Sequence, residues 1–463
     1  MIMPELLMEQ ITAPIFRCRH LGSLKIGLIL VSLLALSACS NPLAKLQILP
    51  QPATNLLEPE IPTASISSPA QAGFLGLPEA ARMALQRHPD ILRAKSYVTK
   101  SATGIALANS VWYPELSYGV SPTYSKNSYG SATAGVSQLV YDFGKSEAEL
   151  GAAQALQAKS EHEVNQAEEA VAAQIAQDYT NLAASIDQID QARGYLVELQ
   201  KLASRVESRV RAGASDASDS ATATVAVDRA QGEVLRAQSQ FATAKSNIAE
   251  VLGQAPERVS AMQDIALLLQ KITEHEESKV APSLLALQSA VEAARHNIDR
   301  AHADVLPPLK LAGQYTEQVS KTGFSGSSWL GLQVTGTFST SGAAGQKIAS
   351  AESDFVAAQQ LLESEKLRLR IALGASDIEV SAAIQRAENN RRIHDLAVHS
   401  NVLSWQEYQL DKKPLNDVIS AERDKYTAMS DVINARADFI KAMIKGLANK
   451  GRLSGGLLAV DQK

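Results

Sequence analysis

Two long stretches of the chain, 144–210 and 343–410, contain no proline and consist mainly of helix-forming residues. At about 1.5 Å of rise per residue, a helix of either length is on the order of 100 Å long. The apolar residues of the first stretch recur every three or four positions, as the seam of a coiled coil requires. They are Ile175, Tyr179, Leu182, Ile186, Ile189, Leu196, Leu199, Val206 and Val210. A compact domain does not need helices of this length, so the chain is predicted to cross a distance.

The composition agrees with long helices. Hydrophobic residues make up 45% of the chain but aromatic residues only 5%, so Ala, Leu and Val supply most of the apolar content. This favours closely packed helices over an aromatic globular core. The formal net charge of −5 provides no basic surface for nucleic acid.

The predicted order of elements occurs twice. A helical stretch over 77–109 ends at WYPEL and another over 283–303 ends at LPPL, and each precedes two short alternating stretches and one long helix. Identical residues recur at a separation of 198 positions, since 342 − 144 = 198. The pairs are Gly144 and Gly342, Asp219 and Asp417, Phe241 and Phe439, and Gly253 and Gly451. We infer an internal duplication.

The short stretches between these helices alternate apolar and polar residues, as in Leu309, Leu311, Gly313 and Tyr315. Such strands are long enough to cross an outer membrane when tilted. The aromatic residues expected at the membrane interface are Trp112, Tyr113, Tyr124, Tyr141 and Trp329. Four strands cannot close a barrel and an open edge is not tolerated in lipid, so three chains would have to pool twelve strands. The alternative is a pair of soluble hairpins that cap a helical bundle.

Residues 1–38 have the pattern of a signal peptide, in which basic residues precede an apolar run over 26–36. That run is too short to span a membrane as a helix. The sequence LSAC, which ends at Cys39, resembles the lipobox of bacterial lipoproteins, and this implies cleavage before Cys39 and lipid attachment to it. Ser40, in place of Asp, implies sorting to the outer membrane. The alternative is an ordinary signal peptide with a chance cysteine.

These signals divide the chain into six segments. The signal peptide over 1–38 is followed by a lipidated, extended tether over 39–76, which is rich in Pro, Ser, Thr and Gln. We predict a first structural repeat over 77–270, with a helix, two strands, a long helix and a return helix. A linker over 271–282, a second repeat over 283–455 and a C-terminal tail over 456–463 complete the chain.

Over nearly all of residues 77–455 the sequence resembles the TolC-like outer-membrane efflux and export channels. The resemblance depends on LPEAARMALQRHPDI, WYPEL, LPPL, QLVYDFGKSEAEL, RVRAGASDASD and the two-fold repeat. It implies a mainly α fold with a small β part, namely long antiparallel coiled-coil helices and four transmembrane strands per protomer. It also implies a homotrimer with a twelve-stranded β-barrel in outer-membrane lipid and an α-helical periplasmic tunnel. A periplasmic adaptor and an inner-membrane ABC or proton-driven transporter are the implied partners.

The resemblance further implies that the turns between long and return helices form periplasmic tips where the adaptor docks. The residues expected there are Val210, Gly213, Ser215, Asp219, Leu410, Asp411 and Asp417. Gly213 fits the turn glycine of the first tip, and Asp411 stands in its place in the second. Asp adopts positive φ at a smaller cost than most residues. Asp219 and Asp417 are predicted to cap the return helices.

The triplet Gly144-Lys145-Ser146 is not predicted to bind nucleotide, because a phosphate-binding loop would need a glycine at the position of Leu139. We interpret Gly144 and Gly342 as the junctions where strands become helices. The second copy has no lysine after its glycine, so Lys145 is predicted to be dispensable.

The sequence contains no catalytic pattern and no metal or cofactor site is expected, since its histidines do not have the spacing of a ligand pair. We therefore predict a passive exit duct, with type I protein secretion favoured by the HPDI-containing first helix and the GASDASD tip. Multidrug efflux is the alternative, because lipidated family members are frequent in such systems. A second alternative is a lipid-anchored periplasmic coiled-coil spacer or adaptor.

Overall fold

The computed structural model describes residues 74–122, 128–254, 256–274, 280–336 and 341–460. The predicted signal peptide, the lipidation site Cys39, most of the tether and Tyr124 lie outside these residues. Within the described part, no helix is long and apolar enough to cross a membrane.

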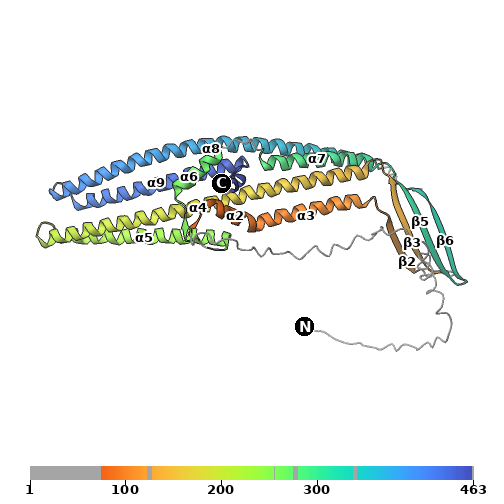
Figure 1. Cartoon of the computed structure of the whole chain (residues 1–463), viewed down its shortest axis with the longest axis horizontal. Helices are drawn as coiled ribbons and strands as arrows, with labels where there is room; N and C mark the ends of the chain where they lie inside the picture. Colours follow the sequence, from red (N-terminus) through yellow and green to blue (C-terminus); the bar gives the residue numbers. More distant parts are fainter. Residues whose placement is uncertain (1–73, 123–127, 255, 275–279, 337–340, 461–463) are drawn as a thin grey trace, which may run out of the picture. The chain divides into compact units, whose positions relative to one another are not determined.

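Two helices of 67 residues each, α4 (Lys145–Arg211) and α8 (Ala343–Gln409), form the frame of the fold (Figure 1). Both predicted long helices are thus confirmed. Each pairs with its return helix, α4 with α5 (Ala217–Leu252) and α8 with α9 (Leu415–Asn449). Figure 1 shows the strands at one end of these helices and the turns 212–216 and 410–414 at the other.

The two halves of the chain repeat the same order, as the sequence predicts. The first half contains β1 (Phe74–Leu75), α2 (Leu77–Arg87), α3 (Pro89–Ser110), β2 (Glu115–Pro122), β3 (Ser128–Tyr141), α4, α5, β4 (Arg258–Val259) and α6 (Met262–Glu274). The second half contains α7 (Pro282–Ala303), β5 (Leu309–Ser320), β6 (Gly323–Val334), α8, α9 and α10 (Leu453–Val460). The shared order runs from α3 to α5 and from α7 to α9, whereas β1, α2 and the elements after the return helices differ between the halves. Helix α5 ends directly before Gly253 and α9 ends two residues before Gly451, and both glycines have positive φ.

The largest apolar core lies where the short helices α2, α6 and α10 pack around α4 and α9. Its centre contains Tyr179, which is fully buried and whose hydroxyl donates to the Leu75 carbonyl at 2.6 Å. The same hydroxyl accepts a hydrogen bond from the backbone N–H of Ser260 at 2.6 Å. Tyr179 therefore connects α4 to the parallel pair β1 and β4.

Two predicted segment boundaries fall inside helices. Helix α6 crosses the boundary between 270 and 271 because both Leu269 and Ile272 are buried in the core. Likewise, the predicted C-terminal tail begins within α10, where Leu453 and Leu457 are fully buried. Residues 456–460 therefore contribute to the core through Leu457.

The four longer strands form one antiparallel sheet in the order β2-β3-β5-β6. Directly paired residues of an antiparallel sheet point to the same face. One face carries the apolar residues predicted from the alternation, and the other carries mainly Ser, Thr, Gly and Gln. The apolar face contains Leu116, Tyr118, Val120, Ala132, Ala134, Val136, Leu311, Gly313, Tyr315, Leu330 and Leu332.

The two long helices differ in burial. Helix α4 lies among α3, α5, α7 and α9, and the residues of its apolar seam are buried or half-buried. Helix α8 contacts only α7 and α9 extensively among the described elements, and several of its large apolar side chains are exposed. These include Leu361, Ile371, Ile378 and Leu396.

Candidate functional site

The two helical turns at the end of the bundle have similar backbones. Gly213 has φ +73° in the first turn and Asp411 has φ +54° in the second, so Asp411 adopts the left-handed conformation of the glycine that it replaces. This agrees with the comparison of the two turns in the sequence. Because Asp is one of the few residues that tolerate this region, the second turn keeps its shape without glycine.

The predicted capping roles of Asp219 and Asp417 are wrong. Helix α5 begins after Asp216 and α9 begins after Pro414, so each aspartate occupies the third helical position. The backbone N–H of Asp219 donates to the Asp216 carbonyl at 3.0 Å. Both carboxylates still lie in the first turn, where they interact favourably with the positive end of the helix dipole.

An arginine that the sequence reasoning missed connects the two tips. Arg209 Nη2 donates to Asp411 Oδ1 at 2.6 Å and to the Ala214 carbonyl at 3.2 Å. Its Nε donates to Ser215 Oγ at 3.3 Å, and its guanidinium lies 5.1 Å from the centre of the Tyr408 ring. The Tyr408 hydroxyl lies 3.2 Å from Ser215 Oγ, within hydrogen-bond distance. One turn earlier, Arg205 lies 5.0 Å from the centre of the Trp405 ring.

The tips enclose a shallow, polar cavity of about 590 Å³. Four of the predicted tip residues line it together, namely Gly213, Ser215, Asp219 and Asp411. The other three do not: Val210 packs against the core between the tips, Leu410 is 65% exposed, and Asp417 lies on the first turn of α9. The contacts that join the tips could not be found from local patterns, because Arg209 is 202 residues from Asp411 and Ser215 is 193 residues from Tyr408.

The strand-to-helix junctions contain the predicted glycines. Gly144 and Gly342 precede α4 and α8 with φ +86° and +72°. At the first junction Phe143 also has positive φ, +59°, and its ring packs edge-on against Tyr141. A positive φ is unusual for a bulky residue, so two consecutive residues make this reversal.

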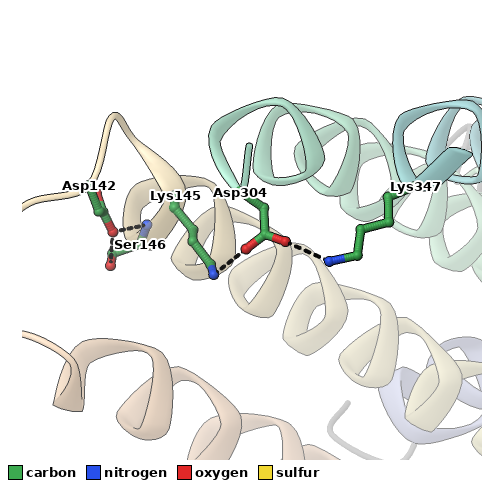
Figure 2. Close-up of polar contacts among 5 residues, drawn as sticks. All are labelled: Asp142, Lys145, Ser146, Asp304 and Lys347. Carbon is green, nitrogen blue, oxygen red and sulfur yellow. Dashed lines mark hydrogen bonds and ion pairs between the residues drawn. The ribbon is translucent and has the colours of Figure 1, made fainter. Parts of the chain in front are cut away.

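A buried carboxylate stabilises the start of α4. Asp142 Oδ2 accepts hydrogen bonds from the backbone N–H of Ser146 at 2.8 Å and from the Ser146 hydroxyl (Figure 2). Asp142 is only 5% exposed. Because the first N–H groups of a helix have no partner within the helix, this side chain satisfies one of them.

Lys145, which the sequence predicts to be dispensable, takes part in an exposed ion pair that the sequence did not reveal. Its Nζ lies 2.5 Å from Asp304 Oδ1, and Lys347 Nζ lies 3.1 Å from the other oxygen of the same carboxylate (Figure 2). The two lysines, Lys145 first, lower the pKa of Asp304. The three residues join the starts of α4 and α8 to the end of α7, although exposed ion pairs of this kind contribute only about 0–1 kcal/mol.

The structure corrects one of the predicted interface aromatics. Trp112 and Tyr113 precede β2, and Tyr141 ends β3, all near the helical end of the sheet. Trp329 instead lies in the middle of β6, and its pairing with Gln314 places it on the polar face. Successive residues of a strand point to opposite faces of the sheet. Because Leu330 lies on the apolar face, its neighbour Trp329 lies on the polar face.

Two tyrosines of the apolar face lie at nearly the same level of the sheet as Trp329. Tyr118 and Tyr315 both pair with Ala134, so they share one level of the apolar face, far from Tyr141 along the strands. Gln138 is a polar residue on this face, and its amide donates to the Trp112 carbonyl at 2.7 Å. The alternation in the sequence predicts that Tyr118 and Tyr315 lie on the same face as Leu116 and Leu311, and the strand pairing agrees with this.

Neither a catalytic centre nor a metal site emerges from this geometry. Among the described residues, no group of three or more His, Cys, Asp or Glu side chains could hold a metal ion. The features that remain are an amphipathic sheet, long helices and paired tips.

Comparison with known proteins supports the prediction that the chain is a channel. A profile of the family described as outer membrane efflux protein matches residues 80–254 and 275–445, which lie in the two structural repeats. Outer membrane protein TolC of Vibrio cholerae is 23% identical over 298 residues, which cover 60% of this chain and 67% of TolC.

Solved channel structures share the fold. The outer membrane protein VceC of Vibrio cholerae has a TM-score of 0.67 at 18% identity, over 81% of this chain and 96% of VceC. The open state of the MtrE outer membrane channel of Neisseria gonorrhoeae has a TM-score of 0.66 at 18% identity, over 82% and 89%. The matched family consists of outer-membrane channels, which are not enzymes, so the alternative of a periplasmic spacer or adaptor is not supported. The chain belongs to the outer membrane efflux protein family and is an efflux channel of the outer membrane.

Proposed function

We propose that three copies of the chain form the exit duct of a tripartite export system. The observation that carries this proposal is the four-stranded sheet, which is apolar on one face and polar on the other. Its edge strands β2 and β6 each pair on one side only. Because unpaired strand edges are not tolerated in lipid, strands from three copies would close a twelve-stranded barrel with the polar face inward.

The exposed apolar residues of α8 support the same assembly. Leu361, Ile371, Ile378 and Leu396 are between 56% and 70% exposed in the single chain. Neighbouring copies would cover these side chains if the long helices continue the barrel as a periplasmic tunnel. Burying them would contribute about 1.5–3 kcal/mol each at full burial.

The tips are the proposed docking site for a periplasmic adaptor. Their shared cavity combines backbone of the turn at Gly213 with the polar side chains of Ser215 and Asp411. An inner-membrane transporter would supply the energy, since the channel has no catalytic centre. At the other end of the chain, we propose that lipid attached to Cys39 anchors each copy to the outer membrane.

We propose secreted protein as the substrate, exported by a type I system with an ABC transporter. The support is the resemblance of LPEAARMALQRHPDI and GASDASD to family members that serve such systems. Multidrug efflux by a proton-driven pump is the second candidate, and the lipobox at Cys39 favours it because lipidated members are frequent in those systems.

Deletion of the gene in its own host separates these substrates. The proposal predicts that one or more large proteins disappear from the culture medium while sensitivity to drugs and dyes changes little. Complementation with the wild-type chain should restore secretion. Unchanged secretion together with drug hypersensitivity would contradict the proposed substrate and support multidrug efflux. Complementation with Cys39→Ser tests the anchor separately, because this variant should lose lipid labelling.

A further inference from the structure

Trp329 lies on the polar face of the sheet. Among the paired residues of the described strands, no other residue of this face is aromatic. Trp329 is paired with Gln314, which is paired with Gly135, which in turn is paired with Ser117. This row crosses the whole sheet near the middle of β6. The neighbouring residues of the face along β6 are Ser327 and Gly331, which are both small.

The indole ring of Trp329 is only partly covered by neighbouring residues. The residue is 47% exposed, and within the described part of the chain no aromatic ring stacks on it and no cation lies over it. A β-carbon added at Gly331 would meet no atom within 4 Å, so the space beside the ring is open. A large apolar side chain that is exposed among Ser, Gly and Gln has no structural explanation in the single chain.

We propose that Trp329 is a substrate-contacting residue in the channel lumen, where three copies form a ring of indoles at one level of the barrel. The inference rests on the proposed trimeric duct, in which the polar face lines the lumen. The face of an indole attracts cations and stacks with aromatic rings, while its N–H donates a hydrogen bond. The ring would therefore favour cationic and aromatic groups of the transported molecule and narrow the path.

The first experiment determines which side of the barrel wall the indole occupies. The full-length protein with Trp112→Phe and Trp405→Phe retains Trp329 as its single tryptophan and is reconstituted in lipid vesicles. We expect acrylamide in the water to quench its fluorescence and brominated phosphatidylcholine to leave it unchanged. The matched control adds Trp329→Phe and Leu330→Trp, which moves the indole by one residue to the apolar face and should reverse both results. Quenching of Trp329 by the brominated lipid would overturn the inference.

The second experiment measures contact with a permeating probe. Tetraphenylphosphonium is an aromatic cation, and we expect it to block single-channel current through the wild-type protein. Trp329→Ala should raise the conductance and weaken this block by roughly two- to fivefold for each indole that contacts the probe. Trp329→Phe should largely retain the block, and Leu330→Ala should leave it unchanged.

The outcomes separate this inference from the proposed function. If wild-type channels form and Trp329→Ala does not alter their block, the inference is wrong while the duct stands. If the wild-type protein forms no channel at all, the duct itself is contradicted and the inference falls with it.

Discussion

Arg209 Nη2 lies 2.6 Å from Asp411 Oδ1, which joins two helical tips that are 202 residues apart in the sequence. Arg209 is also placed over the Tyr408 ring and bonded to Ser215, so one side chain contacts both turns. The contact is partly exposed, since 23% of the arginine side chain and 79% of the aspartate side chain remain accessible. Because the Asp411 carboxylate is mostly exposed to solvent, the pair is expected to contribute no more than an ordinary surface ion pair.

A double-mutant cycle measures this connection. Arg209→Ala and Asp411→Ala, alone and together, should give a coupling free energy of about 0.2–1 kcal/mol in thermal or denaturant unfolding. The single change Arg209→Ala should also make the turns 212–216 and 410–414 more sensitive to limited proteolysis. Arg211→Ala is the matched control, because Arg211 ends the same helix and its side chain bonds to Ser208 of that helix and, among the described residues, to neither turn. Fully additive effects would show that the two tips are not coupled through this pair.

The junction residues Gly144 and Lys145 should respond differently to substitution. Gly144→Val should destabilise the protein by about 1–2 kcal/mol, because a β-branched residue is forced to positive φ. Lys145→Ala removes an exposed ion pair with Asp304 and should cost less than about 1 kcal/mol. Circular dichroism melts of the two variants check this order, and a larger loss for Lys145→Ala would contradict it.

The tips and the strand-to-helix junctions show which features of this fold can be predicted from the sequence and which cannot. The absence of proline predicts α4 and α8, and the recurrence of Gly144 at Gly342 predicts both junctions, because these signals are local or periodic. Asp304 could not be matched to Lys145, since the pair is 159 residues apart and has no counterpart in the other repeat. The caps were misplaced because Asp216 and Asp219 are both plausible helix starts, and only the backbone decides between them. Trp329 could have been placed correctly, because its alternation with Leu330 was already visible.

Glu169 should make the docking of α10 dependent on pH. Its carboxylate is 6% exposed and accepts hydrogen bonds from the N–H groups of Leu453 at 3.0 Å and Ser454 at 3.2 Å, at the start of α10. Burial raises the pKa of Glu169, although the bonds from Ser454 and Leu453 oppose this shift. The unfolded chain therefore releases this proton at a lower pH than the folded chain does.

The sign of the pH effect follows from that order of deprotonation. The contribution of Glu169 to stability is fully present below its unfolded pKa and is lost as pH rises through its folded pKa. The stability of the wild type relative to Glu169→Gln should accordingly fall as pH rises from about 4 to 8 in denaturant unfolding. Glu169→Ala should cost about 1–3 kcal/mol near pH 4, because buried N–H groups of α10 lose their acceptor, and this cost should also fall as pH rises. An advantage of the wild type over Glu169→Gln that grows with pH would contradict the raised pKa.

The central claim is that the chain assembles into a trimeric channel of the outer membrane, and single-channel recording of the purified protein in planar bilayers tests it most directly. The account predicts that detergent-extracted protein from outer-membrane fractions runs as a trimer that dissociates on heating and gives discrete conductance steps of uniform size. Protein that is extracted by water as a monomer and gives no conductance would contradict the claim.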